Sequence, residues 1–287
     1  MKVRRVGIIL KKGSEQPRQI GQELQAFLNE RNIASQVDRV SDDCDMLIIL
    51  GGDGTLLHVA DQASRLQIPV IGVNLGGLGF LTEVSVEELY EVLEHVFNDY
   101  ARIEKRMMLK ARILHPAGAS SWHVALNDVV ISKGTIDRLI LLGAWADEEF
   151  ITSYRADGLI FSTATGSTAY NLSAGGPIVH PMLQSITVTP ICPFMLESRP
   201  VLLPAGVVVS TRRLNPGTTA IQVIVDGRET WEMAEQDVLE VMAAEQPLLL
   251  ICSPKKGYFE ILRNKLNWGG GGKKAPEKGD GSGTRGA

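Results

Sequence analysis

The sequence predicts two domains of unlike class: an α/β N-terminal domain with a doubly wound parallel sheet, followed by a C-terminal all-β, sandwich-like domain. Three observations support this fold class. Strand-length apolar runs alternate with amphipathic helices over about the first hundred residues. After about residue 104, short β-type segments follow one another. A chain of 287 residues is also long enough for two domains at roughly 150 residues each.

Alternating patterns predict the elements of the N-terminal domain. Apolar runs predict strands at residues 6–10, 33–40, 46–50 and 68–74. Apolar residues at helical spacing predict helices at residues 17–32, 55–66 and 85–98. The run MLIIL at 46–50 is continuously apolar, as in strands that are buried on both faces of a parallel sheet. Ser85, with Glu88 three residues later, fits a capping box at the start of the third helix.

Many short strands separated by turns predict the C-terminal domain. These strands are expected at residues 109–114, 122–132, 139–145, 159–162, 185–191, 201–209, 219–225, 238–242 and 248–251. Turn residues occur at 116–118, 215–217 and 226–227, whereas the helix content of 165–185 stays open. We therefore expect domains at residues 1–104 and 105–268, with the option that the last segment returns to the first domain.

The C-terminal end differs in composition from both domains. Residues 269–287 hold 8 glycines in 19 positions and have almost no apolar side chains to bury. Such a segment is expected to be a disordered, solvated tail, which is favoured over a nucleic-acid contact.

Charge and composition exclude several classes of protein. The chain has 29 basic and 33 acidic residues, a net charge of −4, which argues against a dedicated nucleic-acid binder. No run reaches the ~18 apolar residues of a membrane-spanning helix. The three cysteines are far apart in the chain and make neither a disulfide framework nor a zinc knuckle. A soluble, cytoplasmic protein is expected.

The sharpest local feature is the loop GGDGT at residues 51–55. It follows a buried strand and precedes a helix, at the carboxyl end of a parallel strand, where open α/β sheets bind ligands. Glycines let backbone N–H groups approach an anion, and the helix N-terminus adds positive charge. We expect Gly51, Gly52 and Thr55 to form a phosphate loop in which Asp53 serves a metal or a proton transfer. A helix N-cap on a tight turn is the alternative.

A second glycine cluster, NLGGLGF at residues 74–80, also follows a predicted buried strand. We expect Gly76, Gly77 and Gly79 to form a second phosphate loop, and a simple turn is an equal alternative. The P-loop motif is absent, and no GxGxxG motif opens the first strand–helix unit. A P-loop enzyme and an ordinary hydride-transferring dinucleotide site are therefore not supported.

Polar groups mark two further places in the second domain. Hydroxyl side chains crowd residues 165–177 (TGSTAYNLSAGGP), which suits a surface that binds a polar ligand, with Tyr170 offering a ring face. A loop that satisfies its own backbone is the alternative. Asn127 and Asp128 interrupt the apolar strand ALNDVVI, which indicates either a bulge or a binding site.

These motifs, in this order and spacing, resemble those of the NAD kinase family. They are GGDGT, ALNDVVI, DGLIFSTATGSTAYNLSAGGPIVHP, TPICP, the pair Arg199–Pro200 and IVDG, and the match covers roughly residues 3–268. GGDGT is shared with lipid kinases and phosphofructokinases, whereas the long TGSTAYNLSAGGPIVHP block is much more specific. The resemblance implies an α/β domain and a β-rich domain with the dinucleotide between them.

The resemblance also implies which residues act. Asp53 matches the catalytic aspartate, which would orient the acceptor hydroxyl and take its proton. The implied NAD-binding residues are Asp53, Gly54, His58, Asn127, Asp128, Arg138, Arg155, Asp157, Thr168, Ala169, Tyr170, Asn171, Leu172 and Ser173. Mg²⁺ is the implied divalent cation, and no metal ligand beyond Asp53 is assigned.

Three positions depart from the family pattern. Ala164 stands where a proline is usual, Phe194 where a histidine usually follows Cys-Pro, and Arg228 where a glutamine often follows the Asp-Gly turn. None of them lies in GGDGT, so they concern ligand preference and local packing more than the reaction.

The implied reaction transfers the γ-phosphoryl of ATP to the 2′-hydroxyl of the adenosine ribose of NAD and gives NADP. Two other functions remain open: a GGDGT-type kinase of a lipid or sugar phosphate, and a non-catalytic dinucleotide sensor. The expected ligands are NAD and ATP, with neither nucleic acid nor membrane as partner, and the resemblance implies a homodimer or homotetramer.

Overall fold

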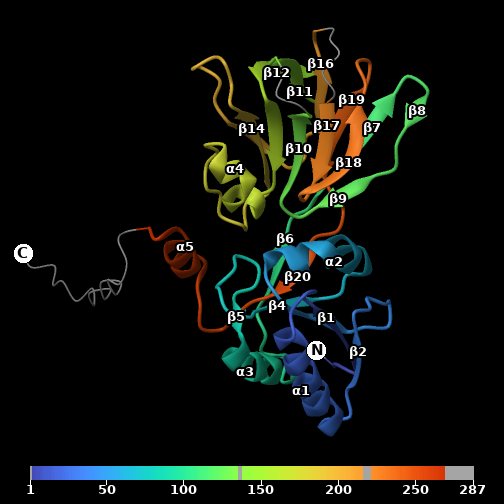
Figure 1. Cartoon of the computed structure of the whole chain (residues 1–287), viewed down its shortest axis with the longest axis vertical. Coiled ribbons are helices and arrows are strands. Elements are labelled where there is room, and N and C mark those ends of the chain that lie inside the picture. The colour runs from blue at the N-terminus through green and yellow to red at the C-terminus, as the bar shows by residue number, and fades with distance from the viewer. Residues whose placement is uncertain (1, 135–137, 216–220, 269–287) are drawn as a thin grey trace, which may run out of the picture.

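The structure is a computed structural model that describes residues 2–134, 138–215 and 221–268, except for the side chains of residues 229 and 230. Figure 1 shows the α/β part below and the β-rich part above, joined by β6 (Ile103–Arg106) and by the chain leading into β20 (Leu248–Ile251). The predicted tail at 269–287 lies outside the described residues, as do residues 216–217 of one predicted turn and residues 219–220 of one predicted strand.

The N-terminal part is a seven-stranded sheet with the strand order β2-β1-β3-β4-β20-β6, in which β5 also pairs with β4. Every pairing is parallel except that of β20 with β6. The remaining strands are β1 (Arg5–Leu10), β2 (Ala34–Val37), β3 (Met46–Leu50), β4 (Val70–Asn74) and β5 (Val84–Ser85), and the helices are α1 (Gln16–Glu30), α2 (Asp53–Leu66) and α3 (Val86–Phe97).

The helices cover both faces of this sheet. Leu24 of α1 and Leu93 of α3 pack with Ile8 and Ile48 on one face. Leu56 and other residues of α2 pack with the neighbouring Ile9 and Ile49 on the other face. The chain leaves β1 for β2 through α1 and leaves β3 for β4 through α2, so the direction of winding changes between β1 and β3. The predicted doubly wound parallel sheet is confirmed.

The C-terminal part consists of two antiparallel sheets. The first has the order β15 (Val201–Pro204), β14 (Ser185–Ile191), β13 (Gly158–Ser162), β10 (Asp128–Lys133), β17 (Ile221–Val225), β18 (Arg228–Met233). The second has the order β12 (Glu149–Ala156), β11 (Ile140–Ala146), β16 (Val209–Arg213), β19 (Val238–Ala243), β7 (Leu109–His115), β8 (Gly118–Ala119), with β9 (His123–Ala125) also paired to β7.

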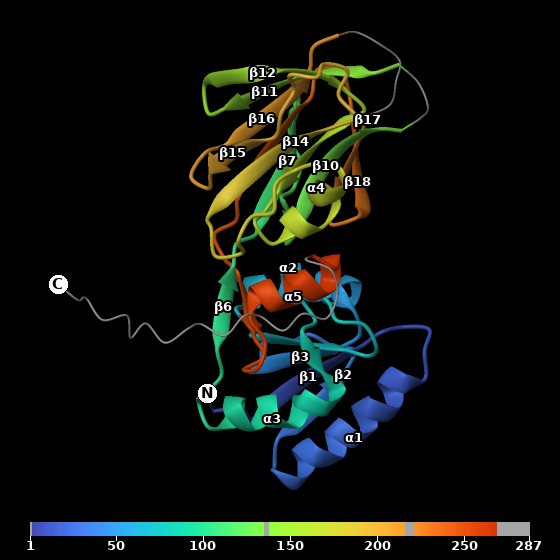
Figure 2. The ribbon, with the colours of Figure 1, turned by 90° about the vertical axis from the view of Figure 1, so that its left-hand side faces the viewer.

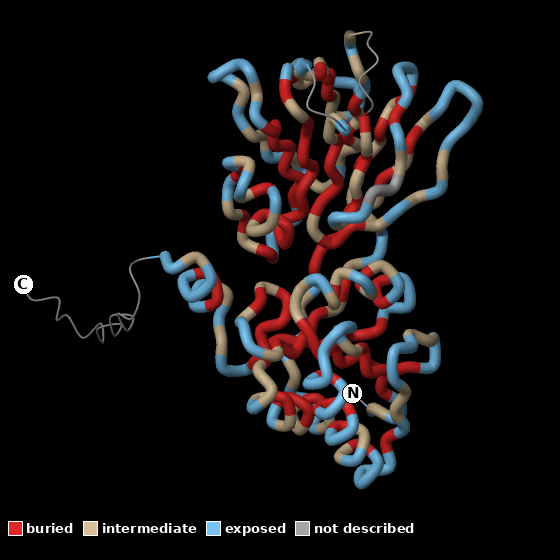
Figure 3. Tube along the Cα trace, in the orientation of Figure 1, coloured by how far each residue is buried: buried red, intermediate tan, exposed pale blue. Residues whose placement is uncertain are grey.

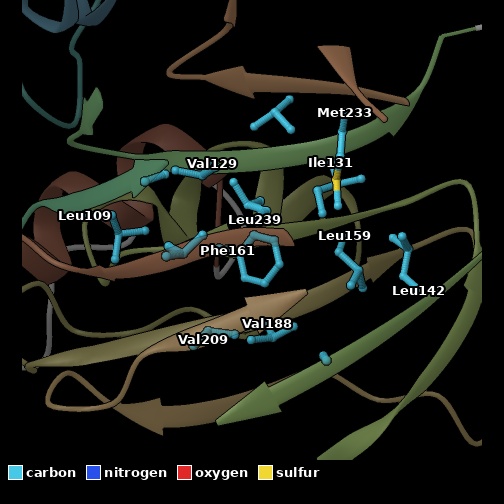
Figure 4. Close-up of a cluster of buried hydrophobic side chains, with 14 of the residues drawn as sticks. Leu109, Val129, Ile131, Leu142, Leu159, Phe161, Val188, Val209, Met233 and Leu239 are labelled. Carbon is cyan, nitrogen blue, oxygen red and sulfur yellow. The ribbon is translucent and has the colours of Figure 1, made fainter. Parts of the chain in front are cut away.

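A shared core holds these two sheets together. Figure 4 shows Val129, Phe161 and Val188 from the first sheet among Leu109, Val209 and Leu239 from the second. Figure 3 shows buried segments running through the centres of both parts of the chain. The predicted sandwich-like β domain is confirmed.

Some elements differ from the prediction. β12 and β18 were not expected, because polar and charged residues interrupt both of their sequences, EFITSYRA and RETWEM. The helix α5 (Tyr258–Leu266) was also missed, since only Ile261 and Leu262 are buried in it. Between residues 165 and 185, helix is limited to a 3₁₀ turn (Gly166–Thr168) and α4 (Tyr170–Ser173).

The chain returns to the first sheet near its end. β20 pairs in parallel with β4 and antiparallel with β6. The expected boundary between residues 104 and 105 falls inside β6, so the domain limits stay a prediction. Within the described residues, none of the helices combines the length and the apolar character needed to cross a membrane.

Candidate functional site

The loop at residues 51–55 is built by the end of a fully buried strand. β3 is buried along its whole length, and the Gly51 N–H donates to the Val73 carbonyl at 3.0 Å. α2 begins two residues later, with Gly52 as its N-cap residue. In the part of the chain that the structure describes, the N–H groups of Gly52, Asp53 and Gly54 have no acceptor. The loop thus presents unpaired donors at the positive end of a helix, as an anion site requires.

The Asp53 carboxylate is held by four hydrogen bonds from one short segment. Its Oδ2 accepts the Phe80 N–H at 2.9 Å. Its Oδ1 accepts the Leu81 N–H at 3.1 Å, the Thr82 N–H at 3.0 Å and the Thr82 hydroxyl at 2.9 Å. These donors fix the orientation of the carboxylate. Asp53 therefore ties the loop after β3 to the loop after β4.

The second glycine cluster contributes one position where only glycine fits. A Cβ at Gly79 would lie 2.1 Å from Asp53 Oδ1 and 2.2 Å from Thr82 Oγ1, far inside van der Waals contact. A Cβ at Gly76 or Gly77 would meet nothing within 4 Å. Gly79 therefore lets the segment of residues 80–82 close over the carboxylate, whereas Gly76 and Gly77 lie at an open surface.

The backbone of Asn127 and Asp128 is held from two sides. The Asp226 carboxylate accepts the N–H groups of Leu126 and Asn127, both at 2.8 Å, and that of Asp128 at 3.1 Å. On the other side, the Thr163 hydroxyl donates to the Leu126 carbonyl at 2.6 Å, and the Thr163 N–H donates to the Asn127 carbonyl at 2.9 Å.

The TGSTAY segment also needs a glycine at this contact. A Cβ at Gly166 would lie 2.1 Å from the Asn127 carbonyl oxygen. The Gly166 N–H donates to Thr163 Oγ1 at 2.9 Å, which closes the turn. The polar pair therefore sits where β10 begins, in a fixed position between this turn and the β17–β18 hairpin.

Asp128 is a buried carboxyl group with a raised pKa. Its side chain is only 6% exposed. Loss of hydration, with the nearby Asp226 carboxylate as the smaller cause, raises the pKa of Asp128 to about 7. Burial also raises the pKa of Asp226, and its three backbone N–H donors and Arg228 oppose that rise. Asp128 can therefore change its protonation state near neutral pH.

A cavity of about 390 Å³ joins α2 to the β-rich part. It is lined by Leu57 of α2 and by Asn127, Asp128, Val130, Ala169, Tyr170, Ile224, Asp226 and Gly227. Figures 1 and 2 both show α4, which begins at Tyr170, on the side of the β-rich part that faces α2. Asp53 lies one helical turn before Leu57, on the same side of α2. Four of the predicted site residues therefore line a cavity next to the side of α2 that carries Asp53. They are Asn127, Asp128, Ala169 and Tyr170.

The other predicted residues of the run at 168–173 differ from one another in burial and contacts. The Asn171 amide donates to the Ser167 and Pro177 carbonyls at 3.1 and 3.0 Å, and its Oδ1 accepts the Thr189 hydroxyl at 2.6 Å. Asn171 is fully buried, so its side chain holds the loop together. Thr168 and Leu172 are half-buried, and Ser173 is exposed.

Other predicted residues lie outside this cavity. Gly54 and His58 line a second cavity on the neighbouring side of α2, together with Thr55. Asp157 forms an ion pair with Lys133, with 2.6 Å between Oδ1 and Nζ. The exposed Arg155 stacks on the Phe194 ring, with 4.9 Å between its Cζ atom and the ring centroid. Arg138 is exposed and precedes β11.

Four residues that shape the site were not among the predicted ones. They are Thr82, Thr163, Asp226 and Arg228. The Asp226–Gly227 turn was visible as a turn signal, but its contact with residues about 100 positions earlier was not. Arg228 Nη2 donates to the Leu57 carbonyl at 3.0 Å and so links the β17–β18 turn to α2. Within the described residues, no group of three or more His, Cys, Asp or Glu side chains could hold a metal ion.

The packing at Gly79 predicts a sharp contrast between two glycines. Gly79→Ala should destabilise the fold by about 1–3 kcal/mol, because the new methyl group overlaps Asp53 and Thr82. Gly76→Ala, with open space around it, should stay within about 0.5 kcal/mol of the unmodified protein. Thermal unfolding of both variants measures the difference. Equal unfolding midpoints would contradict the close contact.

The raised pKa of Asp128 predicts a pH-dependent stability. Between about pH 4 and pH 7 the carboxyl group ionises in the unfolded chain but stays protonated in the folded one, so the folded state loses stability as the pH rises. The Asp128→Asn variant does not lose stability in this way. The difference between its unfolding midpoint and that of the unmodified protein should therefore increase as the pH rises from about 4 to about 7. The exposed Asp42→Asn serves as a control for charge. Parallel pH profiles for all three proteins would exclude the shift.

Comparison with known proteins identifies the family. Residues 8–101 match the model of the ATP-NAD kinase N-terminal domain, and residues 126–253 match that of the ATP-NAD kinase C-terminal domain. The chain is 41% identical to a NAD kinase of Trichlorobacter lovleyi, over 93% of this chain and 99% of that protein. It is 40% identical to a NAD kinase of Solibacter usitatus, over 93% and 98%.

Solved structures agree with this result. Yeast NADH kinase in complex with NADH has a TM-score of 0.86 and 26% identity, and the match covers 96% of this chain and 90% of that one. A NAD kinase from Archaeoglobus fulgidus in complex with ATP has a TM-score of 0.74 over 92% and 98%, and at 22% identity it bears on the fold alone. With both domain models matched and about 40% identity over most of its length, this chain belongs to the NAD kinase family and is a kinase.

Proposed function

We propose that this protein transfers the γ-phosphoryl group of ATP to the 2′-hydroxyl of the adenosine ribose of NAD, giving NADP. Membership of the NAD kinase family supports this reaction. The main observation in favour of this reaction is that hydrogen bonds orient the Asp53 carboxylate at the start of α2. Asp53 lies one helical turn before Leu57, and Leu57 lines the same cavity as Asn127 and Asp128.

The 390 Å³ cavity has the chemistry of a nucleoside site. Asn127 and Asp128 offer an amide and a carboxyl group, and Tyr170, 46% exposed, offers a ring face. We assign NAD to this cavity, with the run from Thr168 to Ser173 forming its floor. Further NAD contacts from Gly54, His58, Arg138, Arg155 and Asp157 remain predictions.

The hydrogen bonds of Asp53 suggest how it acts. A carboxylate has about four acceptor positions, two on each oxygen. Oδ1 already accepts three hydrogen bonds, whereas Oδ2 accepts one. Oδ2 therefore has room for the 2′-hydroxyl of NAD. Phosphoryl transfer has a loose transition state with little early proton loss, so Asp53 orients the hydroxyl and takes its proton late.

Transfer from ATP requires positive charge near the donor phosphates, and this charge does not have to come from a metal ion enclosed by protein ligands. Mg²⁺ is commonly held by substrate phosphates, water and one or two carboxylates. Since the described residues offer no cluster of metal ligands, we propose that Mg²⁺ arrives with ATP. It would neutralise charge on the phosphates, and Asp53 is the one carboxylate of the loop that could bind it. The unpaired N–H groups of Gly52, Asp53 and Gly54 would hold phosphate oxygens.

The alternatives are less well supported. A lipid or sugar-phosphate kinase would share GGDGT, but not the match of the C-terminal domain model over residues 126–253. A sensor without turnover would not require an oriented carboxylate. Activity with both NAD and NADH should be measured, because a structural relative is named an NADH kinase.

A homo-oligomer, dimer or tetramer, is part of the proposal. Apolar side chains are exposed near the edge strands β12 and β15, where Phe150, Phe194, Leu196 and Leu202 are 52, 61, 86 and 52% exposed. Large apolar side chains at exposed positions of this kind favour a contact between protein chains. Light scattering should give two or four times the mass of one chain, and Leu196→Glu should lower it. A monomeric mass would reject this part of the proposal.

Replacing the carboxylate should separate catalysis from local structure. Asp53→Asn should lower kcat by about 10²-fold or more, since general-base catalysis is lost, while NAD still binds. Thr82→Val removes one hydrogen-bond donor to Asp53 but keeps the carboxylate, so kcat should stay within about tenfold. NADP is measured with an NADP-specific dehydrogenase, and NAD binding by calorimetry.

Two results would count against this role. If Asp53→Asn kept a kcat near that of the unmodified enzyme, the carboxylate would not be catalytic. If Thr82→Val lost as much activity as Asp53→Asn, Asp53 would act only by holding the two loops together.

A further inference from the structure

The segment of residues 253–262, which follows β20, contacts both parts of the molecule. The chain passes into the β-rich part after β6 and returns before β20. Figures 1 and 2 both show α5 at the height of α2 and below α4, where the two parts meet. We propose that residues 253–262 form a strap that sets the position of Asp53 relative to the cavity assigned to NAD, with Lys256 and Tyr258 as positioning residues. This inference rests on the proposed function.

The first half of the strap is fixed to the segment that holds Asp53. The Ser253 N–H donates to Glu83 Oε1 at 2.5 Å, and the two residues are only 0 and 3% exposed. Lys256 Nζ donates to the Glu83 carbonyl at 3.0 Å. Glu83 directly follows Thr82, whose N–H and hydroxyl both donate to Asp53. A shift of the strap would therefore be passed to the Asp53 carboxylate through two adjacent residues.

The second half of the strap contacts the β-rich part. Tyr258 is the first residue of α5, and the burial of Ile261 and Leu262 fixes this helix. The Tyr258 ring packs edge-on against the His180 ring, with 4.9 Å between the centroids. The Tyr258 hydroxyl donates to the Val179 carbonyl at 3.4 Å, which is long for a hydrogen bond between two oxygens. The ring contact is therefore the stronger link at this end.

This end of the strap is connected to the wall of the cavity assigned to NAD. The Val179 N–H donates to the fully buried Ser167 Oγ at 2.9 Å. Ser167 follows Gly166, which closes against the Asn127 carbonyl, and Tyr170 in the same turn lines the cavity. Among the described residues that line the cavity, none belongs to the strap. The strap therefore acts on the site through other residues and does not touch NAD.

The reaction requires groups from both parts to meet at a fixed distance. Asp53 belongs to the α/β part, whereas Asn127 and Asp128 lie where β10 begins in the β-rich part. A displacement of about 1 Å between reacting groups can lower a rate by about 10²-fold. Loss of either end of the strap should therefore lower kcat more than it weakens the binding of NAD.

Two neighbouring lysines provide a variant and its matched control. Lys255 and Lys256 each pair with a glutamate of α3, Glu91 and Glu88, and Lys256 also donates to the Glu83 carbonyl. Lys256→Gln should lower kcat about tenfold, whereas Lys255→Gln should keep it within about twofold. NAD binding in calorimetry should change less than about threefold, because the cavity is lined mostly by the β-rich part.

Variants of Tyr258 test the other end. Tyr258→Phe keeps the ring against His180 and should keep kcat within about threefold, since the lost hydrogen bond is long. Tyr258→Ala loses the ring contact and should lower kcat about tenfold. Tyr100→Ala removes a tyrosine that is 79% exposed outside the strap, and it should leave kcat unchanged.

A double variant shows whether the two ends act through one segment. If the strap works only when both ends are attached, Lys256→Gln combined with Tyr258→Ala should lower kcat about as much as either change alone. Independent roles would multiply the two losses. The rates are compared at a temperature at which circular dichroism shows every variant to be folded.

Amide hydrogen exchange provides a readout that does not depend on turnover. Lys256 contacts the α/β part, yet Lys256→Gln should speed exchange at residues 167–179 of the β-rich part. Tyr258 contacts the β-rich part, yet Tyr258→Ala should speed exchange at residues 80–83 of the α/β part. A purely local structural role would speed exchange only next to the substituted residue.

Four results would overturn the inference. They are exchange effects confined to the substituted residue's own side, a double variant whose loss of kcat is the product of the single losses, an equal loss of kcat in Lys255→Gln and Lys256→Gln, and a raised KM for NAD with unchanged kcat.

The exchange measurement also separates this inference from the proposed function. If the unmodified protein forms no NADP, the proposed function fails, and exchange effects on the opposite side of the strap still support the strap. If NADP forms but neither these exchange effects nor the losses of kcat occur, the proposed function stands and the strap is rejected.

Discussion

The contact between Asp53 and the segment of residues 80–82 is the interaction on which the rest of the site depends. Three backbone N–H groups and one hydroxyl converge on a single carboxylate, and Gly79 makes the approach possible. The contact joins the loops that follow β3 and β4, two neighbouring strands of the parallel sheet. Because these donors restrain the carboxylate, its free acceptor position points in a defined direction before any substrate binds.

In the β-rich part, a carboxylate and a glycine again hold two backbone segments together. The Asp226 carboxylate accepts three successive backbone N–H groups, and Gly166 lets the TGSTAY turn close against Asn127. Arg228 joins this hairpin to α2 through the Leu57 carbonyl. Backbone geometry fixed by carboxylates and glycines thus positions the polar groups on both sides of the α2 N-terminus. In our proposal this N-terminus holds the donor phosphates, and NAD occupies the neighbouring cavity.

Local sequence predicted much of the fold and part of the site. β3 has the predicted bounds of 46–50, since a five-residue continuous apolar run is typical of a strand that is buried on both faces of a parallel sheet. GGDGT and the pair Asn127–Asp128 were visible because polar residues interrupt apolar patterns. The contact of Asp226 with residues 126–128 was not visible, because strand spacing carries no information on partners about 100 residues away. The edge strand β12 and the helix α5 bury few apolar side chains, so their patterns were weak. Composition also gave no reason to place Gly54 and His58 in a different cavity from Asn127.

The central claim is that NAD and the phosphate donor occupy separate sites beside the α2 N-terminus, so that the phosphoryl group passes directly from ATP to NAD. Initial rates of NADP formation, measured while NAD and ATP are both varied, test this most directly. The account predicts intersecting double-reciprocal lines, the pattern of a complex that holds both substrates at once. Parallel lines, the pattern of a phosphorylated enzyme intermediate, would contradict it.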